Sequence, residues 1–146
     1  MTRSSRERSS TSHERDSEKR STGLLFDELK VALIISKALD IIERLRRKRV
    51  RVSDRKAIYM IDTLIYKIRR LLDEPITGAQ KEILLRISGE LHLRRAFLPD
   101  QGDYWKSLMD AMKCFNEAYE IIPIPATRDK SVGIWNFICL HTTRPR

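Results

Sequence analysis

The sequence holds few of the residues from which catalytic and metal sites are usually built. Its 146 residues include 5 glycines, 2 cysteines and 3 histidines, and none of them cluster into a recognisable motif. The sequence has no glycine-rich phosphate-binding loop, no HExxH metal motif and no GxSxG nucleophile motif. We therefore expect no enzymatic activity, no bound metal and no cofactor.

Long apolar runs are missing as well. The most apolar stretch, VALIISKALDII, is interrupted by Lys37 and Asp40 and is too short to cross a bilayer, so we expect no stable membrane insertion. The two cysteines, Cys114 and Cys139, stand far apart and lack the spacing of a zinc site. We expect both to be free thiols in a reducing compartment.

Residues 1–22 contain serine, threonine and charged residues, with no large apolar residue after Met1. A segment of this composition cannot bury enough surface to offset the entropy lost on ordering. We expect residues 1–22 to form a disordered basic tail, and residues 23–146 to form one α-helical domain.

From residue 23 onward, apolar residues recur at spacings of three and four, which is the period of an amphipathic helix. Thr77 and Gln80 have the spacing of a capping box, and Pro123 and Pro125 are expected to separate the last two helices. No stretch alternates between apolar and polar residues as a strand does. The sequence predicts an all-α fold, a compact bundle of about five helices whose last helix is short and begins near Thr127.

The same periodicity predicts which residues form the core. Gly89 either weakens its helix or permits close packing there. Glu82 with Arg86, and Glu90 with Arg94, are expected to form ion pairs on the outer face of the third helix. The expected structural core consists of Ile35, Ile42, Ile61, Leu64, Ile68, Leu84, Ile87, Trp105, Leu108, Phe115 and Trp135.

Positive charge is concentrated in one short stretch, RLRRKRVRVSDRK. It places eight positive charges and one negative charge in 13 residues, while the whole chain carries a net charge of +9. A local cluster of this kind attracts anionic partners without determining the fold. The candidate contacts are Arg44, Arg46, Arg47, Lys48, Arg49, Arg51, Arg55 and Lys56.

Three interpretations of this basic cluster stay open at the level of sequence. In the first interpretation, the cluster is a solvated joint between two helices, whose cations suit the C-terminal end of a helix. In the second, it is a phosphate-binding surface for RNA or DNA, although no aromatic residue lies within it to stack on a base. In the third, it is a nuclear import signal, for which basic runs of this length are typical.

Several segments together resemble the C proteins of paramyxoviruses. The segment DEPITGAQKEIL, from Asp73 to Leu84, resembles a family motif. It is followed by Trp105 near the start of a helix, by Phe115-Asn-Glu-Ala before the break at Pro123, and by Trp135 in the final helix. The resemblance covers residues 57–138 with gaps, and the charged, serine-rich start of the chain is similar as well.

The resemblance implies a viral accessory protein without catalytic activity. Its implied partners are host signalling proteins of the interferon response and components of the viral polymerase, whose RNA synthesis it would modulate. The implied location is the host cell cytoplasm, with the nucleus added if the basic cluster is an import signal. The alternative from the residues is a nucleic-acid-binding helical protein that uses the cluster at 44–56, and self-association through apolar helix faces is a third hypothesis.

Overall fold

The apolar residues of this chain return every three to four positions, and each helix buries the stripe that they form. The computed structural model describes residues 28–47, 54–98 and 104–143, and within these ranges it contains five helices and no strand. The all-α fold predicted from the sequence is confirmed. The expected tail at 1–22 lies outside the described residues.

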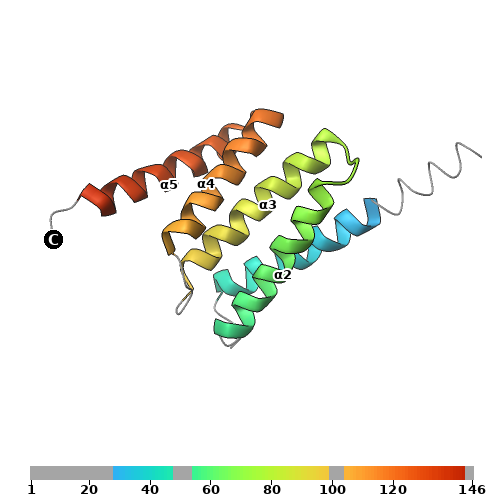
Figure 1. The fold of residues 1–146 in the computed structure, drawn as a ribbon, viewed down its shortest axis with the longest axis horizontal. Helices are drawn as coiled ribbons and strands as arrows, with labels where there is room; N and C mark the ends of the chain where they lie inside the picture. The colour runs from blue at the N-terminus through green and yellow to red at the C-terminus, as the bar shows by residue number, and fades with distance from the viewer. Residues whose placement is uncertain (1–27, 48–53, 99–103, 144–146) are drawn as a thin grey trace, which may run out of the picture. The chain divides into compact units, whose positions relative to one another are not determined.

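The first helix occupies the described residues 28–47 and is followed by α2 (Asp54–Leu72), α3 (Gly78–Ala96), α4 (Tyr104–Ile121) and α5 (Pro125–Thr143). The chain divides into two units between Leu33 and Ile34, and α2 to α5 all belong to the second unit. Within it, α2 packs on α3, α3 on α4 and α4 on α5, and consecutive helices run in opposite directions (Figure 1). The contact between α3 and α4 is the most extensive.

The ends of the helices follow from local chemistry. The hydroxyl of Thr77 accepts a hydrogen bond from the backbone N–H of Gln80 at 3.1 Å, and the Gln80 side chain accepts one from the backbone N–H of Thr77 at 2.9 Å. This capping box confirms the start predicted for α3. Pro125 was expected to break the chain, but it is the first residue of α5, where its fixed φ and missing N–H are tolerated. As a result α5 is as long as α3, and the short helix predicted from Thr127 is wrong.

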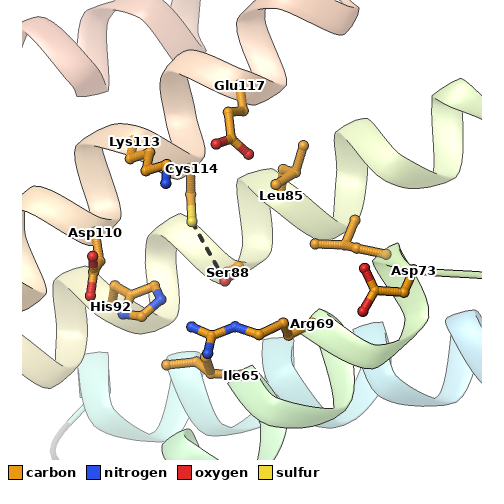
Figure 2. Close-up of a pocket in the computed structure, with 11 residues that line it drawn as sticks. Ile65, Arg69, Asp73, Leu85, Ser88, His92, Asp110, Lys113, Cys114 and Glu117 are labelled. Carbon is orange, nitrogen blue, oxygen red and sulfur yellow. Dashed lines mark hydrogen bonds between the residues drawn. The ribbon is translucent and has the colours of Figure 1, made fainter.

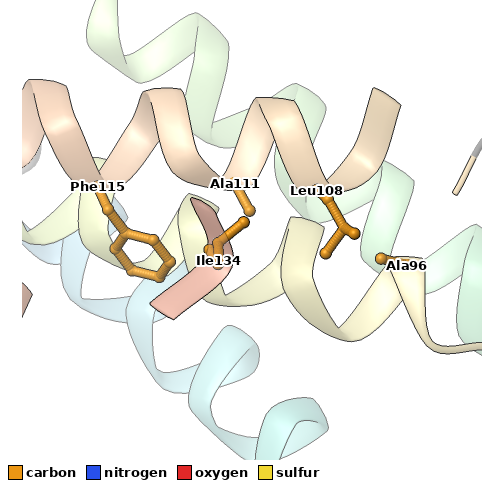
Figure 3. Packing of buried hydrophobic residues seen from close by; sticks show 5 residues of the cluster. All are labelled: Ala96, Leu108, Ala111, Phe115 and Ile134. Atoms are coloured by element: carbon orange, nitrogen blue, oxygen red, sulfur yellow. The ribbon is translucent and has the colours of Figure 1, made fainter. Parts of the chain in front are cut away.

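The centre of the core lies where α3, α4 and α5 meet. Phe115 is fully buried, and it forms a cluster with Ala96, Leu108, Ala111 and Ile134 (Figure 3). Burying a side chain of this size contributes roughly 1.5–3 kcal/mol. The two alanines keep the helices close together, so that the ring of Phe115 reaches α3.

Most residues expected in the core occupy it, but the two tryptophans do not. Trp105 is 40% exposed and Trp135 is 51% exposed, so their placement in the core was wrong. Each follows the helical period, but each sits one position beside the stripe that its helix buries. Ile35 and Ile42 are half-buried, and the buried members of the predicted set are Ile61, Leu64, Ile68, Leu84, Ile87, Leu108 and Phe115.

The positions expected for the charged residues of α3, on its outer face, also need correction. Glu82 is only 2% exposed, and its carboxylate is bound by Arg86 through two contacts of 2.8 and 3.1 Å. Glu90 forms its ion pair with Lys130 of α5. A residue pair at the spacing of one helical turn is equally compatible with an outer face and with a helix interface, and Lys130 of α5 reaches Glu90 on this side of α3.

No helix in the described ranges is long and apolar enough to cross a membrane.

Candidate functional site

The described part of the basic cluster lies at the end of the first helix and the start of α2. Arg44 pairs with Asp40 at 3.1 Å, while Glu43 binds Arg47 at 2.5 Å and Arg46 at 3.5 Å. These side chains are about half exposed, and exposed pairs of this spacing contribute about 0.3–0.5 kcal/mol each. The three arginines are therefore engaged with carboxylates that an anionic partner can displace at small cost.

The remainder of the cluster is divided by the chain segment between these helices. Lys48, Arg49 and Arg51 lie outside the described residues. Arg55 and Lys56 are exposed in the first turn of α2. Arg44, Arg46 and Arg47 thus lie in the last turns of the first helix, and Arg55 and Lys56 lie in the first turn of α2. The three interpretations of the cluster stay predictions.

A polar groove that the sequence did not reveal lies over α3, between α2 and α4 (Figure 2). Ser88 and His92 of α3 form its floor, Arg69 of α2 lines one wall, and Asp110 and Cys114 of α4 line the other. The groove encloses about 260 Å³ here and continues into a neighbouring pocket of about 420 Å³ toward the end of α3. Its lining is mixed in charge, since cationic and anionic side chains come from both walls.

The thiol in this groove is not activated. Cys114 donates a hydrogen bond to the hydroxyl of Ser88 at 3.7 Å, and both cysteines are half-buried and form no disulfide with a described residue. Burial raises the pKa of the Cys114 thiol, with a smaller opposing effect of the bond to Ser88. A nucleophilic cysteine needs the opposite shift. Both cysteines carry reduced thiols, as expected from the sequence, and the environment of Cys114 is that of a packing residue.

The environment of the histidine in the groove disfavours its charged form. His92 is 8% exposed, and burial lowers the pKa of its imidazole below the ordinary value of 6.5. Arg69 and Arg95 lower this pKa further, while Asp110 and Asp62 oppose them. The neutral ring offers one donor and one acceptor to the groove.

An arginine network joins the helices at the other end of the groove. Arg95 of α3 binds both carboxylate oxygens of Asp62 in α2, at 2.6 and 3.3 Å, and donates to the hydroxyl of Ser107 in α4 at 3.3 Å. One guanidinium thus connects three helices, in a geometry that suits its planar fork. Asp62 and Arg95 are 33 residues apart, so no local pattern in the sequence could have predicted the pair.

A second surface lies along the line where α4 and α5 meet. A hydrogen bond from Ser131 to Asn116 joins the two helices, and Trp135 lies one turn beyond Ser131. Because the helices are antiparallel, Trp135 is level with Met112, which lies one turn before Asn116. We name as the tryptophan seam the apolar residues that follow this line, namely Trp105, Met109, Met112, Trp135 and Ile138.

The tryptophan seam is exposed on its outer side and joined to the core on its inner side. Trp105, Met109 and Trp135 are 40%, 45% and 51% exposed. Met112 and Ile138 are partly buried and pack against the cluster around Phe115. Tryptophan and methionine are enriched in the buried centres of protein interfaces, so an exposed row of them is typical of a binding surface.

The described residues contain no group of three or more His, Cys, Asp or Glu side chains placed to hold a metal ion. The arrangement as a whole offers a polar groove, an apolar seam and a basic cluster for binding. No protein-family model, no curated protein and no solved structure shows significant similarity to the chain.

Proposed function

We propose that this chain is a non-enzymatic regulatory protein that acts by binding other proteins. The observation that carries the proposal is the tryptophan seam, in which Trp105 and Trp135 are held on two packed helices and exposed. A side chain that is fixed by its neighbours loses little entropy when a partner covers it, which favours binding.

The identity of the partners rests on the resemblance to the paramyxovirus C proteins. In this proposal the chain binds host signalling proteins and thereby weakens the interferon response. It also modulates viral RNA synthesis through components of the polymerase. The protein acts in the host cell cytoplasm, and the basic cluster adds a nuclear fraction if it serves as an import signal.

The test is affinity purification of the full chain from human cells, with and without co-expressed viral polymerase proteins, followed by quantitative mass spectrometry. The wild type is compared with Trp135→Ala and with Leu140→Ala. Leu140 is 59% exposed on the same helix and lies on the opposite side from Trp135, so its variant is a matched control.

We expect the wild type and Leu140→Ala to recover a component of interferon signalling or of the polymerase, and Trp135→Ala to recover it at least about tenfold less. Equal recovery by all three proteins would show that the tryptophan seam is not the contact. Recovery of the chain alone, together with a dimer in sedimentation experiments that Trp135→Ala abolishes, would assign the seam to self-association instead.

A second candidate function is binding of nucleic acid through the basic cluster. The concentration of eight cations in 13 residues favours it, because these cations account for most of the net charge of the chain. Fluorescence anisotropy with single- and double-stranded RNA and DNA across a salt series tests it. Binding that falls steeply with salt, and that is lost when Arg46, Arg47, Lys48, Arg49 and Arg51 are replaced by Gln, would place this function first.

A further inference from the structure

A ladder of four charged residues, Glu82, Arg86, Glu90 and Arg94, runs along α3 at the spacing of one helical turn. Glu82 is bound by Arg86, and Glu90 is bound by Lys130 of α5. Both carboxylates of the ladder are therefore engaged. Arg94 forms no ion pair with any described residue, and its Nε is buried without a hydrogen-bond partner.

Arg94 lies where two pockets adjoin. One pocket of about 360 Å³ lies between α3 and α5, and another of about 470 Å³ lies between α3 and the first helix. Glu90, Arg94 and Lys130 line both of them. Both pockets therefore border the side chain of Arg94, whose Nε has no hydrogen-bond partner among the described residues.

The pocket between α3 and α5, which we name the arginine groove, is apolar apart from these charges. Its walls include Leu93 from α3, Phe97 directly after α3, and Ile134 and Phe137 from α5. Phe97 is 58% exposed and meets Phe137 edge to face, with ring centroids 5.8 Å apart. Gly133 lies on the same wall, and a Cβ built on it would find no atom within 4 Å, so the groove is open at this point.

The charges around the groove favour an anionic group. Burial lowers the pKa of the Lys130 ammonium, and the positive charge of Arg86 lowers it further. Cations also outnumber carboxylates in the lining of the pocket toward the first helix. A carboxylate placed on Arg94 would offset this repulsion and supply the acceptor that the buried Nε lacks.

The geometry points to the arginine groove as the binding site for an acidic, apolar segment of a partner protein. A carboxylate of that segment binds Arg94, and its bulky apolar side chains lie against Leu93, Ile134 and Phe137. Apolar walls beside one unpaired cation suit leucine-like side chains beside an aspartate or glutamate, in the manner of an amphipathic helix in a groove. A nucleic acid would instead require a row of cations along its backbone. The inference rests on the proposed function and names the chemistry of one partner.

The test uses the full chain and two synthetic, fluorescein-labelled helical peptides of about 15 residues. In the first peptide, leucine residues recur at the helical period with glutamate beside them on the same face. In the second peptide, each glutamate is replaced by glutamine. Binding is measured by fluorescence anisotropy for the wild type, Arg94→Gln, Arg128→Gln and Gly133→Met. Arg128 is an exposed arginine of α5 that does not line the groove, so its variant is the matched control for charge.

We expect the wild type and Arg128→Gln to bind the glutamate peptide about tenfold more tightly than the glutamine peptide. Arg94→Gln should remove this preference. Gly133→Met, which places a side chain in the open wall without a change in charge, should weaken binding of both peptides. Circular dichroism of each variant checks that it remains folded.

The inference is overturned if the wild type shows no preference between the peptides, or if Arg94→Gln retains the preference. It is also overturned if neither peptide binds while single-stranded RNA binds through Arg94. In each of these cases the dependence of partner recovery on Trp135 is unaffected, so failure of the arginine groove is distinguishable from failure of the proposed function.

Discussion

Gly89 of α3 lies directly against the ring of Phe115 in α4. A Cβ built on Gly89 would fall 2.8 Å from both Cε1 and Cζ of that ring, which is closer than non-bonded carbon atoms approach. The absence of a side chain at Gly89 is therefore what allows the largest buried side chain of the core to lie where it does. Of the two roles considered for Gly89 from the sequence, close packing is the one that the structure shows.

Replacement of Gly89 by alanine should destabilise the fold, although alanine is the better helix former by about 1 kcal/mol. The clash with a buried ring should outweigh that gain and lower the free energy of unfolding by about 1–2 kcal/mol in urea titrations. Gly133→Ala is the matched control, because its Cβ meets nothing within 4 Å, and it should stabilise the protein by about 0.5–1 kcal/mol. If Gly89→Ala is as stable as Gly133→Ala, the packing described for Phe115 is wrong.

Because the carboxylate of Glu82 is buried, the stability of the fold should depend on its ion pair with Arg86. Arg86→Ala leaves that carboxylate without its cation at 2% exposure, and we expect a loss of about 2 kcal/mol in the free energy of unfolding. Arg44→Ala removes an equally spaced pair whose side chains are 49% and 59% exposed, and should cost less than about 0.5 kcal/mol. Adding Glu82→Gln to Arg86→Ala should recover part of the loss. Equal costs for the two arginines would contradict the burial of Glu82.

The lowered pKa of His92 predicts a loss of stability in mild acid. The unfolded chain takes up a proton on this histidine near pH 6.5, whereas the folded protein does so only at a lower pH, because burial disfavours the charged ring. Its contribution to stability is therefore complete above pH 6.5 and is lost as the pH falls toward the pKa of the folded state, by at most about 1.4 kcal/mol per pH unit.

Chemical unfolding at several pH values between about 7 and 5 measures this effect, because only histidine has an ordinary pKa in that range. The difference in unfolding free energy between wild type and His92→Gln should shrink as the pH falls. A constant difference across the range would show that His92 titrates alike in the folded and unfolded chains.

Much of the fold could be predicted from the sequence because a helix is specified by residues that are close together along the chain. The spacing of apolar residues placed α2 to α4, and the Thr77 and Gln80 side chains placed the start of α3. Pro125 was misread because the same residue that ends one helix is favoured at the first position of the next.

The candidate sites were harder to predict because they depend on which faces of the helices pack against each other. Trp105 lies three positions before Leu108, so periodicity assigned both to the core, yet only Leu108 faces α3. The link between Asp62 and Arg95 joins positions 33 residues apart and leaves no local pattern. The basic cluster was easy to recognise because its charged residues are adjacent in the sequence, but charge alone does not identify the partner that it binds.

The most direct test of the account is an interferon-β promoter reporter in human cells that express the full chain, its Trp105→Ala/Trp135→Ala variant or Leu140→Ala at matched protein levels. The account predicts that the wild type and Leu140→Ala suppress the reporter, and that the double variant has lost most of this suppression while its melting curve shows it folded. Failure of the wild type to suppress the reporter, or equal suppression by the double variant, would contradict the claim that this protein acts on innate immune signalling through the tryptophan seam.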